Sequence, residues 1–244
     1  MVPRCKVHER RVMRKWETVD LGIYAKALPL LAKNPVIAVF PLLAALIGIA
    51  LGFLNGPLFG QLGGFDFGIT GLITNLLQGF AFGLAILAAE DAWRSGKARF
   101  ASTWDEGKRK AGSILLAALG FTFVLFAASL VAGYFGPLGI VLIALVLFFL
   151  IYTIPAAAIG GIPGAAALSV SIQKVRGNPL AAAVLCIVAL LLYFYLLSLM
   201  LPYVVDWTAT FAPYVLAAAR ALVIAYLALV FARQYDEVSF FRRY

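Results

Sequence analysis

Apolar residues run through this chain in long blocks that are separated by short polar segments. Several blocks exceed the roughly 18 apolar residues that mark a candidate membrane-spanning helix. Each supplies about the 20 residues that a hydrocarbon core of about 30 Å requires. The pattern predicts an all-α, polytopic membrane protein with about six transmembrane helices, at residues 35–54, 69–89, 113–133, 140–160, 179–201 and 213–232.

The segments before the first, third and fifth blocks mix apolar and charged residues. In the first segment, apolar residues recur at three- and four-residue spacing opposite Lys26 and Lys33. This spacing suits a helix that lies in the headgroup plane of a membrane. In the second segment, Ser102 and Asp105 resemble a capping box, so a helix is expected to start there.

Two Asn-Pro steps, at Pro35 and Pro179, mark places where the chain turns from the surface into the membrane. Proline in the first turn of a helix costs no hydrogen bond and pushes the preceding residue out of helical geometry. We therefore predict three transmembrane hairpins, each preceded by a short interfacial amphipathic helix. The chain divides into a basic cytoplasmic tail with an interfacial helix (1–34), a six-span transmembrane bundle (35–232) and a cytoplasmic tail (233–244).

The basic residues favour one side of the membrane. Of 20 Lys and Arg residues, 19 lie in the two tails and in segments 90–112 and 161–178, whereas segments 55–68, 134–139 and 202–212 contain none. Basic residues accumulate in cytoplasmic segments of membrane proteins. This distribution predicts a multi-pass protein of the plasma membrane with both termini in the cytoplasm.

Composition and charge narrow the partners. With 64% hydrophobic and 13% charged residues, the chain is far more apolar than a soluble domain. Its net charge of +9 does not indicate nucleic-acid binding, because the cations lie between spans. Each Lys or Arg near the surface instead adds about 1 kcal/mol of attraction to anionic lipid. The candidate headgroup contacts are Lys108, Arg109, Lys110, Lys174 and Arg176.

Residues that support catalysis are scarce. The chain has one histidine, His8, in the basic tail, and no HExxH, CxxC or glycine-rich phosphate loop. Most carboxylates alternate with Lys and Arg, which is typical of solvated ion pairs rather than of metal ligands. Glu90 and Asp91, at the end of the second span, remain as a candidate ion or proton site. We expect no enzyme activity, no metal and no cofactor.

Arg220 is the one basic residue inside a predicted span. A charge in the hydrocarbon costs at least about 2.5 kcal/mol, so it needs polar partners or water. Asn75 and Gln78 of the second span offer side-chain amides at a similar depth, and Asp66 and Asp206 are the carboxylates of the outer segments. Three roles stay open for Arg220: a bond that pins the sixth helix to the second, snorkelling to the outer surface, or a functional site for an anion or lipid headgroup.

Glycine pairs at four-residue spacing occur in the first two spans, at Gly48 and Gly52 and at Gly79 and Gly83. This spacing lets helices approach closely in a membrane. The contact is expected either within the chain or between two copies of it.

Two stretches resemble a known group of membrane proteins. These are TIPAAAIGGIPGAAALSVSIQKVRGNPLAAAVL and LAILAAEDAWRSGKARFASTWDEGKRKAGSILL. They are similar to the membrane-domain superfamily of glycerophosphoryl diester phosphodiesterases and related uncharacterised six-helix prokaryotic membrane proteins. Gly160 and Gly161 stand where that group typically has an acidic residue. The resemblance implies about six helices, cytoplasmic termini and a membrane domain without assigned catalytic residues.

The leading functional hypothesis is a non-enzymatic membrane-organising protein or scaffold subunit that contacts anionic lipids on the cytoplasmic face. An alternative is a transporter or channel for an anion or lipid that uses Arg220. A third is an enzyme of lipid headgroups. Protein partners and homo-oligomers are compatible with each of these.

Overall fold

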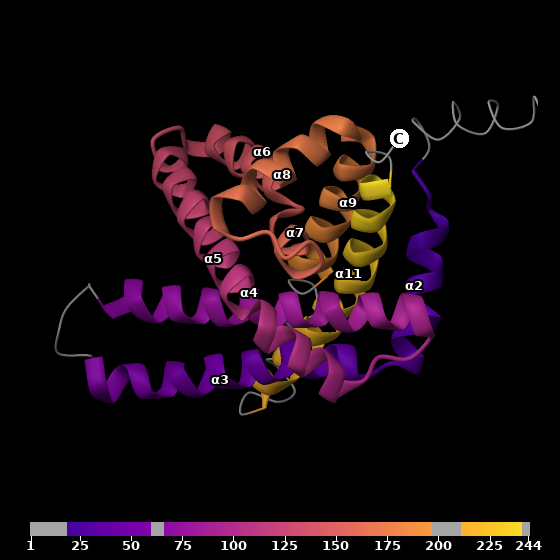
Figure 1. Ribbon diagram of the computed structural model, residues 1–244. Coiled ribbons are helices and arrows are strands. Elements are labelled where there is room, and N and C mark those ends of the chain that lie inside the picture. Colours follow the sequence, from indigo (N-terminus) through magenta and orange to yellow (C-terminus); the bar gives the residue numbers. More distant parts are fainter. Residues whose placement is uncertain (1–18, 60–65, 197–210, 241–244) are drawn as a thin grey trace, which may run out of the picture.

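The computed structural model describes residues 19–59, 66–196 and 211–240, and the regular structure of these residues is entirely helical. The all-α prediction is confirmed. Figure 1 shows the helices in order along the chain. They are α2 (Gly22–Lys33), α3 (Val36–Phe59), α4 (Asp66–Ser95), α5 (Phe100–Gly133), η2 (Gly136–Leu138), α6 (Gly139–Leu150), α7 (Thr153–Ala158), α8 (Gly164–Gly177), α9 (Pro179–Leu190), the π-helical turn η3 (Leu191–Leu196) and α11 (Ala212–Phe240).

Helices long and apolar enough to cross a membrane confirm that the protein is membrane-embedded. Among the described residues, 4 helical segments meet this condition: Gly71–Ser95, Phe100–Gly133, Gly139–Ala158 and Ala212–Glu237. Two bent helix pairs raise the number to 6 if each pair is counted as one span. The predicted polytopic architecture therefore stands.

The bent pairs are α2 with α3, which meet at 80°, and α8 with α9, which meet at 111°. Both bends fall at the predicted Asn-Pro steps. Asn178 caps the start of α9, because its side-chain oxygen accepts a hydrogen bond from the Ala181 N–H at 3.3 Å, and Pro179 occupies the first turn. If α3 and α9 cross the bilayer, then α2 and α8 lie near its surface, which agrees with the predicted interfacial helices.

The helix predicted before the third span is not a separate element. Helix α5 runs for 34 residues from Phe100 to Gly133 without a break. It starts two residues before Ser102, and its N-cap, Arg99, makes no side-chain capping bond. The predicted capping box is therefore wrong: the Ser102 hydroxyl lies 3.3 Å from Asp91 Oδ2 instead. No proline interrupts this segment, so nothing forces a bend where one was expected.

Close contacts between α4 and α5 depend on glycine. A Cβ atom on Gly79 would lie 2.7 Å from Ala118 Cβ, and one on Gly83 would lie 2.6 Å from Ile114 Cγ2. The second glycine pair therefore joins two helices of the same chain. Helix α11 packs across both α3 and α4, which lie side by side as a hairpin (Figure 1).

The fourth predicted span remains one candidate membrane span, Gly139–Ala158, but contains a short turn between α6 and α7, which we call the break. Tyr152, in the break, donates its backbone N–H to Ser171 Oγ at 3.0 Å, and the Ser171 hydroxyl donates to the Phe149 carbonyl at 2.8 Å. Ser171 belongs to α8, and it is fully buried, as is Tyr152. One serine from a neighbouring helix thus satisfies backbone groups that the break leaves without intrahelical partners.

Candidate functional site

The basic segments contain a set of exposed cations that make no ion pair with a described residue. We call them the open cations. They lie on α2, in the α4–α5 connection, early in α5 and at the end of α8. Their members are Lys26, Lys33, Lys97, Arg99, Arg109 and Arg176.

Two of the predicted headgroup contacts are used inside the protein. Lys110 donates to the carbonyl oxygens of Ala158 and Ile159 at the end of α7, at 2.8 and 3.3 Å, and its ammonium pairs with Glu106 at 2.8 Å. The Lys174 ammonium lies 3.0 Å from the centre of the Tyr235 ring and 3.2 Å from the Tyr235 carbonyl oxygen. Their ammonium groups are therefore engaged by the protein itself.

The other predicted headgroup contacts point outward. Arg109 and Arg176 are exposed and belong to the open cations. Lys108 is exposed as well, but its ammonium pairs with Asp105 at 2.8 Å. A shallow recess lined by Asp105, Lys108 and Arg109 marks this face of α5. Arg109 and Arg176 thus remain the better candidates for lipid contact.

Glu90 and Asp91 do not form a joint site. Glu90 is 8% exposed and pairs with Arg94 one helical turn later. Asp91 faces Ser102 of α5 instead. No group of three or more His, Cys, Asp or Glu residues that could hold a metal ion occurs in the described part of the chain.

Asp236 of α11 is half-buried near three cations. Arg94 of α4, Lys174 of α8 and Arg233 of α11 lie close enough to act electrostatically on its carboxylate. Opposite charges nearby offset part of the cost of removing a carboxylate from water.

The polar cluster predicted around Arg220 is not assembled among the described residues. Arg220 is exposed on α11, Asn75 is exposed on α4, and Gln78 is half-buried. Within the described part of the chain, Arg220 makes no hydrogen bond with either amide and no ion pair with a carboxylate. Asp206 and the side chain of Asp66 lie outside the described residues.

Helix α2 has a buried face and an exposed apolar face. Ile23 and Ala27 are buried against the bundle, whereas Leu21 and Leu28 are 66% and 60% exposed. The Tyr226 hydroxyl of α11 donates to the Tyr24 carbonyl at 3.2 Å and holds α2 in place. A helix that exposes both leucines and lysines is typical of a membrane interface.

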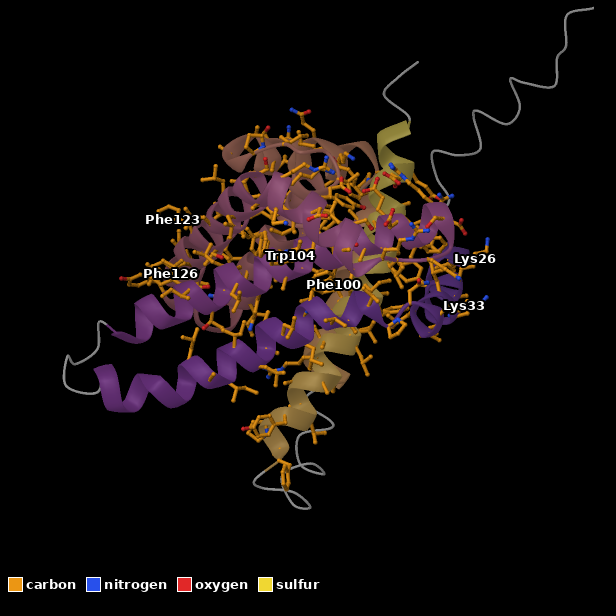
Figure 2. All side chains as sticks on the ribbon, turned by 60° about the horizontal axis from the view of Figure 1, so that its bottom comes forward. Lys26, Lys33, Phe100, Trp104, Phe123 and Phe126 are labelled. Atoms are coloured by element: carbon orange, nitrogen blue, oxygen red, sulfur yellow. The ribbon has the colours of Figure 1, made fainter. Side chains whose placement is uncertain are left out.

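The exposed surface changes character along the molecule. Lys26 and Lys33 lie at one end in the view of Figure 2, and Phe123 and Phe126 of α5 lie toward the opposite side. Both phenylalanines are largely exposed, at 70% and 60%. Large exposed apolar side chains on a long apolar helix are suited to contact with lipid chains.

An aromatic shelf connects α3 and α5. The Phe40 and Phe100 rings stack with centroids 5.1 Å apart, and the Phe100 and Trp104 rings stack at 6.5 Å. Phe100 and Trp104 are 43% and 40% exposed. Trp side chains are enriched at membrane interfaces, where an apolar ring meets polar headgroups.

No protein-family model, curated protein or solved structure matches this chain. The geometry described above is therefore the basis for a functional assignment.

Proposed function

We propose that this protein is a non-enzymatic integral membrane protein that organises the cytoplasmic leaflet or acts as a scaffold subunit by contacting anionic lipids. The observation that carries the proposal is the set of open cations, which are exposed and make no ion pair with a described residue. An unpaired surface cation is available to a lipid phosphate, whereas a paired one such as Lys108 is already partly neutralised.

The arrangement of α2 supports the proposal. Helix α2 meets α3 at 80°, so a membrane-spanning α3 would place α2 near the headgroups. Lys26 and Lys33 on α2 are exposed, and so are Leu21 and Leu28. Apolar burial and attraction to anionic headgroups then act together on one helix.

We also propose that the protein resides in the plasma membrane with both termini in the cytoplasm. The open cations fall in the segments that the charge distribution assigns to the inside. The resemblance of the sequence to the six-helix superfamily agrees with this orientation. It also agrees with a membrane domain that has no catalytic residues.

The proposal can be tested by native mass spectrometry of the purified protein with mixed phosphatidylglycerol and phosphatidylcholine. We expect preferential retention of phosphatidylglycerol that weakens with salt, because exposed charges are screened. The variant Lys26→Gln/Arg109→Gln/Arg176→Gln should show a weaker preference for phosphatidylglycerol over phosphatidylcholine. Each charge removed should lower this preference roughly fivefold, because each contributes about 1 kcal/mol of attraction. Lys108→Gln is the matched control and should change the preference little.

Equal retention of both lipids by the wild-type protein would contradict the proposal. So would turnover of the lipids during incubation, because that result would favour the enzyme hypothesis. Circular dichroism of each variant checks that the helices are intact.

A further inference from the structure

Asn34 joins two segments that are far apart in the sequence. Its side-chain oxygen accepts a hydrogen bond from the Ala98 N–H at 2.7 Å, and its amide nitrogen donates to the Gly96 carbonyl at 3.3 Å. Asn34 itself is only 3% exposed. The α2–α3 corner is therefore fixed against the α4–α5 connection by a buried side chain.

This contact fixes the backbone next to three open cations. Lys33 directly precedes Asn34, Lys97 directly precedes Ala98, and Arg99 directly follows it. All three cations are exposed and make no ion pair with a described residue. An anion at this corner is attracted by all three charges.

The aromatic shelf begins next to these cations. Arg99 is the N-cap of α5, and Phe100, the first residue of α5, stacks on Phe40 of α3. Trp104 follows one helical turn later and extends the stack. The start of α5 also contributes the positive end of its helix dipole. A cationic surface thus adjoins an exposed apolar one.

We propose that the corner formed by Lys33, Lys97, Arg99, Phe100 and Trp104 binds one anionic phospholipid. The phosphate of this lipid pairs with the three cations, and its acyl chains lie against the two aromatic rings. Arginine matches phosphate with two parallel hydrogen bonds, whereas lysine acts as a point charge. The shelf selects a lipid rather than free phosphate, because free phosphate has no apolar part to bury. This inference rests on the proposed function and assigns one site to it.

Trp104 provides a local probe of this site. Phosphatidylglycerol and phosphatidylcholine with brominated acyl chains are mixed in turn into vesicles that contain the protein, and quenching of tryptophan fluorescence is measured. The difference between the wild-type protein and Trp104→Phe isolates the signal of Trp104. We expect brominated phosphatidylglycerol to quench this signal at a lower mole fraction than brominated phosphatidylcholine, by roughly fivefold or more.

The charge variant tests which residues produce the preference. In the variant Lys33→Gln/Lys97→Gln/Arg99→Gln, the two brominated lipids should quench the fluorescence of Trp104 equally. The matched control Lys26→Gln/Arg109→Gln/Arg176→Gln removes three open cations elsewhere and should keep the preference at Trp104. All six side chains are exposed, so both variants are expected to fold.

The outcomes separate this site from the wider proposal. Equal quenching of wild-type Trp104 by both lipids overturns the site, even if the protein still retains phosphatidylglycerol overall. If the wild-type protein retains both lipids equally in native mass spectrometry but still shows the preference at Trp104, the wider proposal is wrong and the site stands. If millimolar inorganic phosphate abolishes the preference at Trp104, the corner is a simple anion site and the lipid assignment is wrong.

Asn34→Ala tests the positioning role of the clamp. The variant keeps all three cations but releases the α4–α5 connection, so the preference at Trp104 should fall while the net charge is unchanged. A full preference in a folded Asn34→Ala protein would show that the clamp does not position the cations.

Discussion

Lys110 donates a hydrogen bond to the carbonyl oxygen of Ala158 at 2.8 Å, and so joins α5 to the end of α7. The last carbonyl groups of a helix lack intrahelical partners, and Lys110 supplies a donor to two of them. Glu106 pairs with the same ammonium group. Lys110 therefore acts as a structural cap of α7, although it lies in a segment expected to face lipid headgroups.

Lys110→Met should lower the free energy of unfolding by about 1–3 kcal/mol, because it leaves partly buried carbonyl groups without a donor. Thermal or denaturant unfolding in detergent measures this change. Lys108→Met is the control and should cost less than about 1 kcal/mol, since the pair of Lys108 with Asp105 is exposed. Similar losses from both variants would argue against the capping role.

Ser171→Ala should destabilise the protein by about 1–3 kcal/mol, since it leaves the buried Tyr152 N–H and the Phe149 carbonyl unpaired. Ser169→Ala is the matched control on the same helix. The Ser169 hydroxyl is exposed and bonds only the local Ala166 carbonyl, so its loss should have little effect. Equal unfolding midpoints for the two variants would mean that the α6–α7 break does not depend on Ser171.

Gly83→Ala should destabilise the α4–α5 contact by about 1–3 kcal/mol, because the new methyl group would lie 2.6 Å from Ile114 in a fully buried position. Gly112→Ala is the control, and its expected effect on stability has the opposite sign. No atom lies within 4 Å of a Cβ built there, and alanine favours a helix over glycine by about 0.5–1 kcal/mol. The two variants should therefore shift the melting temperature in opposite directions.

Arg220→Leu should leave the stability in detergent unchanged or raise it, because Arg220 is exposed and has no described partner to lose. Arg233→Leu is the comparison on the same helix. It removes an ion pair with Glu237 and a guanidinium 5.8 Å from the centre of the Trp93 ring, and should cost about 0.5–1 kcal/mol. A loss of more than about 1 kcal/mol in Arg220→Leu would support the bond that pins the sixth helix.

The ends of several helices could be predicted because local residues determine them. Proline and a preceding asparagine produce the corners at Pro35 and Pro179, and α3 and α9 begin within one residue of the prediction. Helix α11 likewise starts at Ala212, one residue before the predicted span. Each boundary depends on residues next to one another in the chain, so the sequence alone contains the information.

The α6–α7 break could not be predicted in the same way. The segment from Gly139 to Ala158 is uniformly apolar, and the residue that makes the break tolerable, Ser171, belongs to another helix. The same limitation applies to Lys174, whose partner Tyr235 lies far along the chain. Tertiary contacts of this kind leave no trace in a local pattern.

The open cations were only partly predicted. Lys97 and Arg99 were absent from the candidate headgroup contacts, and Lys110 was included. A local signal does exist, since Lys108 and Lys110 have carboxylates one turn earlier on α5, whereas Lys97 and Arg99 have none at three- or four-residue spacing. Comparing charges at helical spacing would have separated Lys97 and Arg99 from Lys108 and Lys110. It would not have identified Arg109, which has Asp105 and Glu106 at that spacing and still makes no ion pair with a described residue.

The repair of the α6–α7 break by Ser171 also has a consequence for biosynthesis. A ribosome completes Tyr152 before it reaches Ser171, so the newly made fourth span enters the membrane while its broken turn still lacks that hydroxyl. Backbone groups without partners are costly in hydrocarbon. The fourth span is therefore expected to stay beside the insertion machinery until α8 has emerged, and the second hairpin to mature only after the start of the third has been translated.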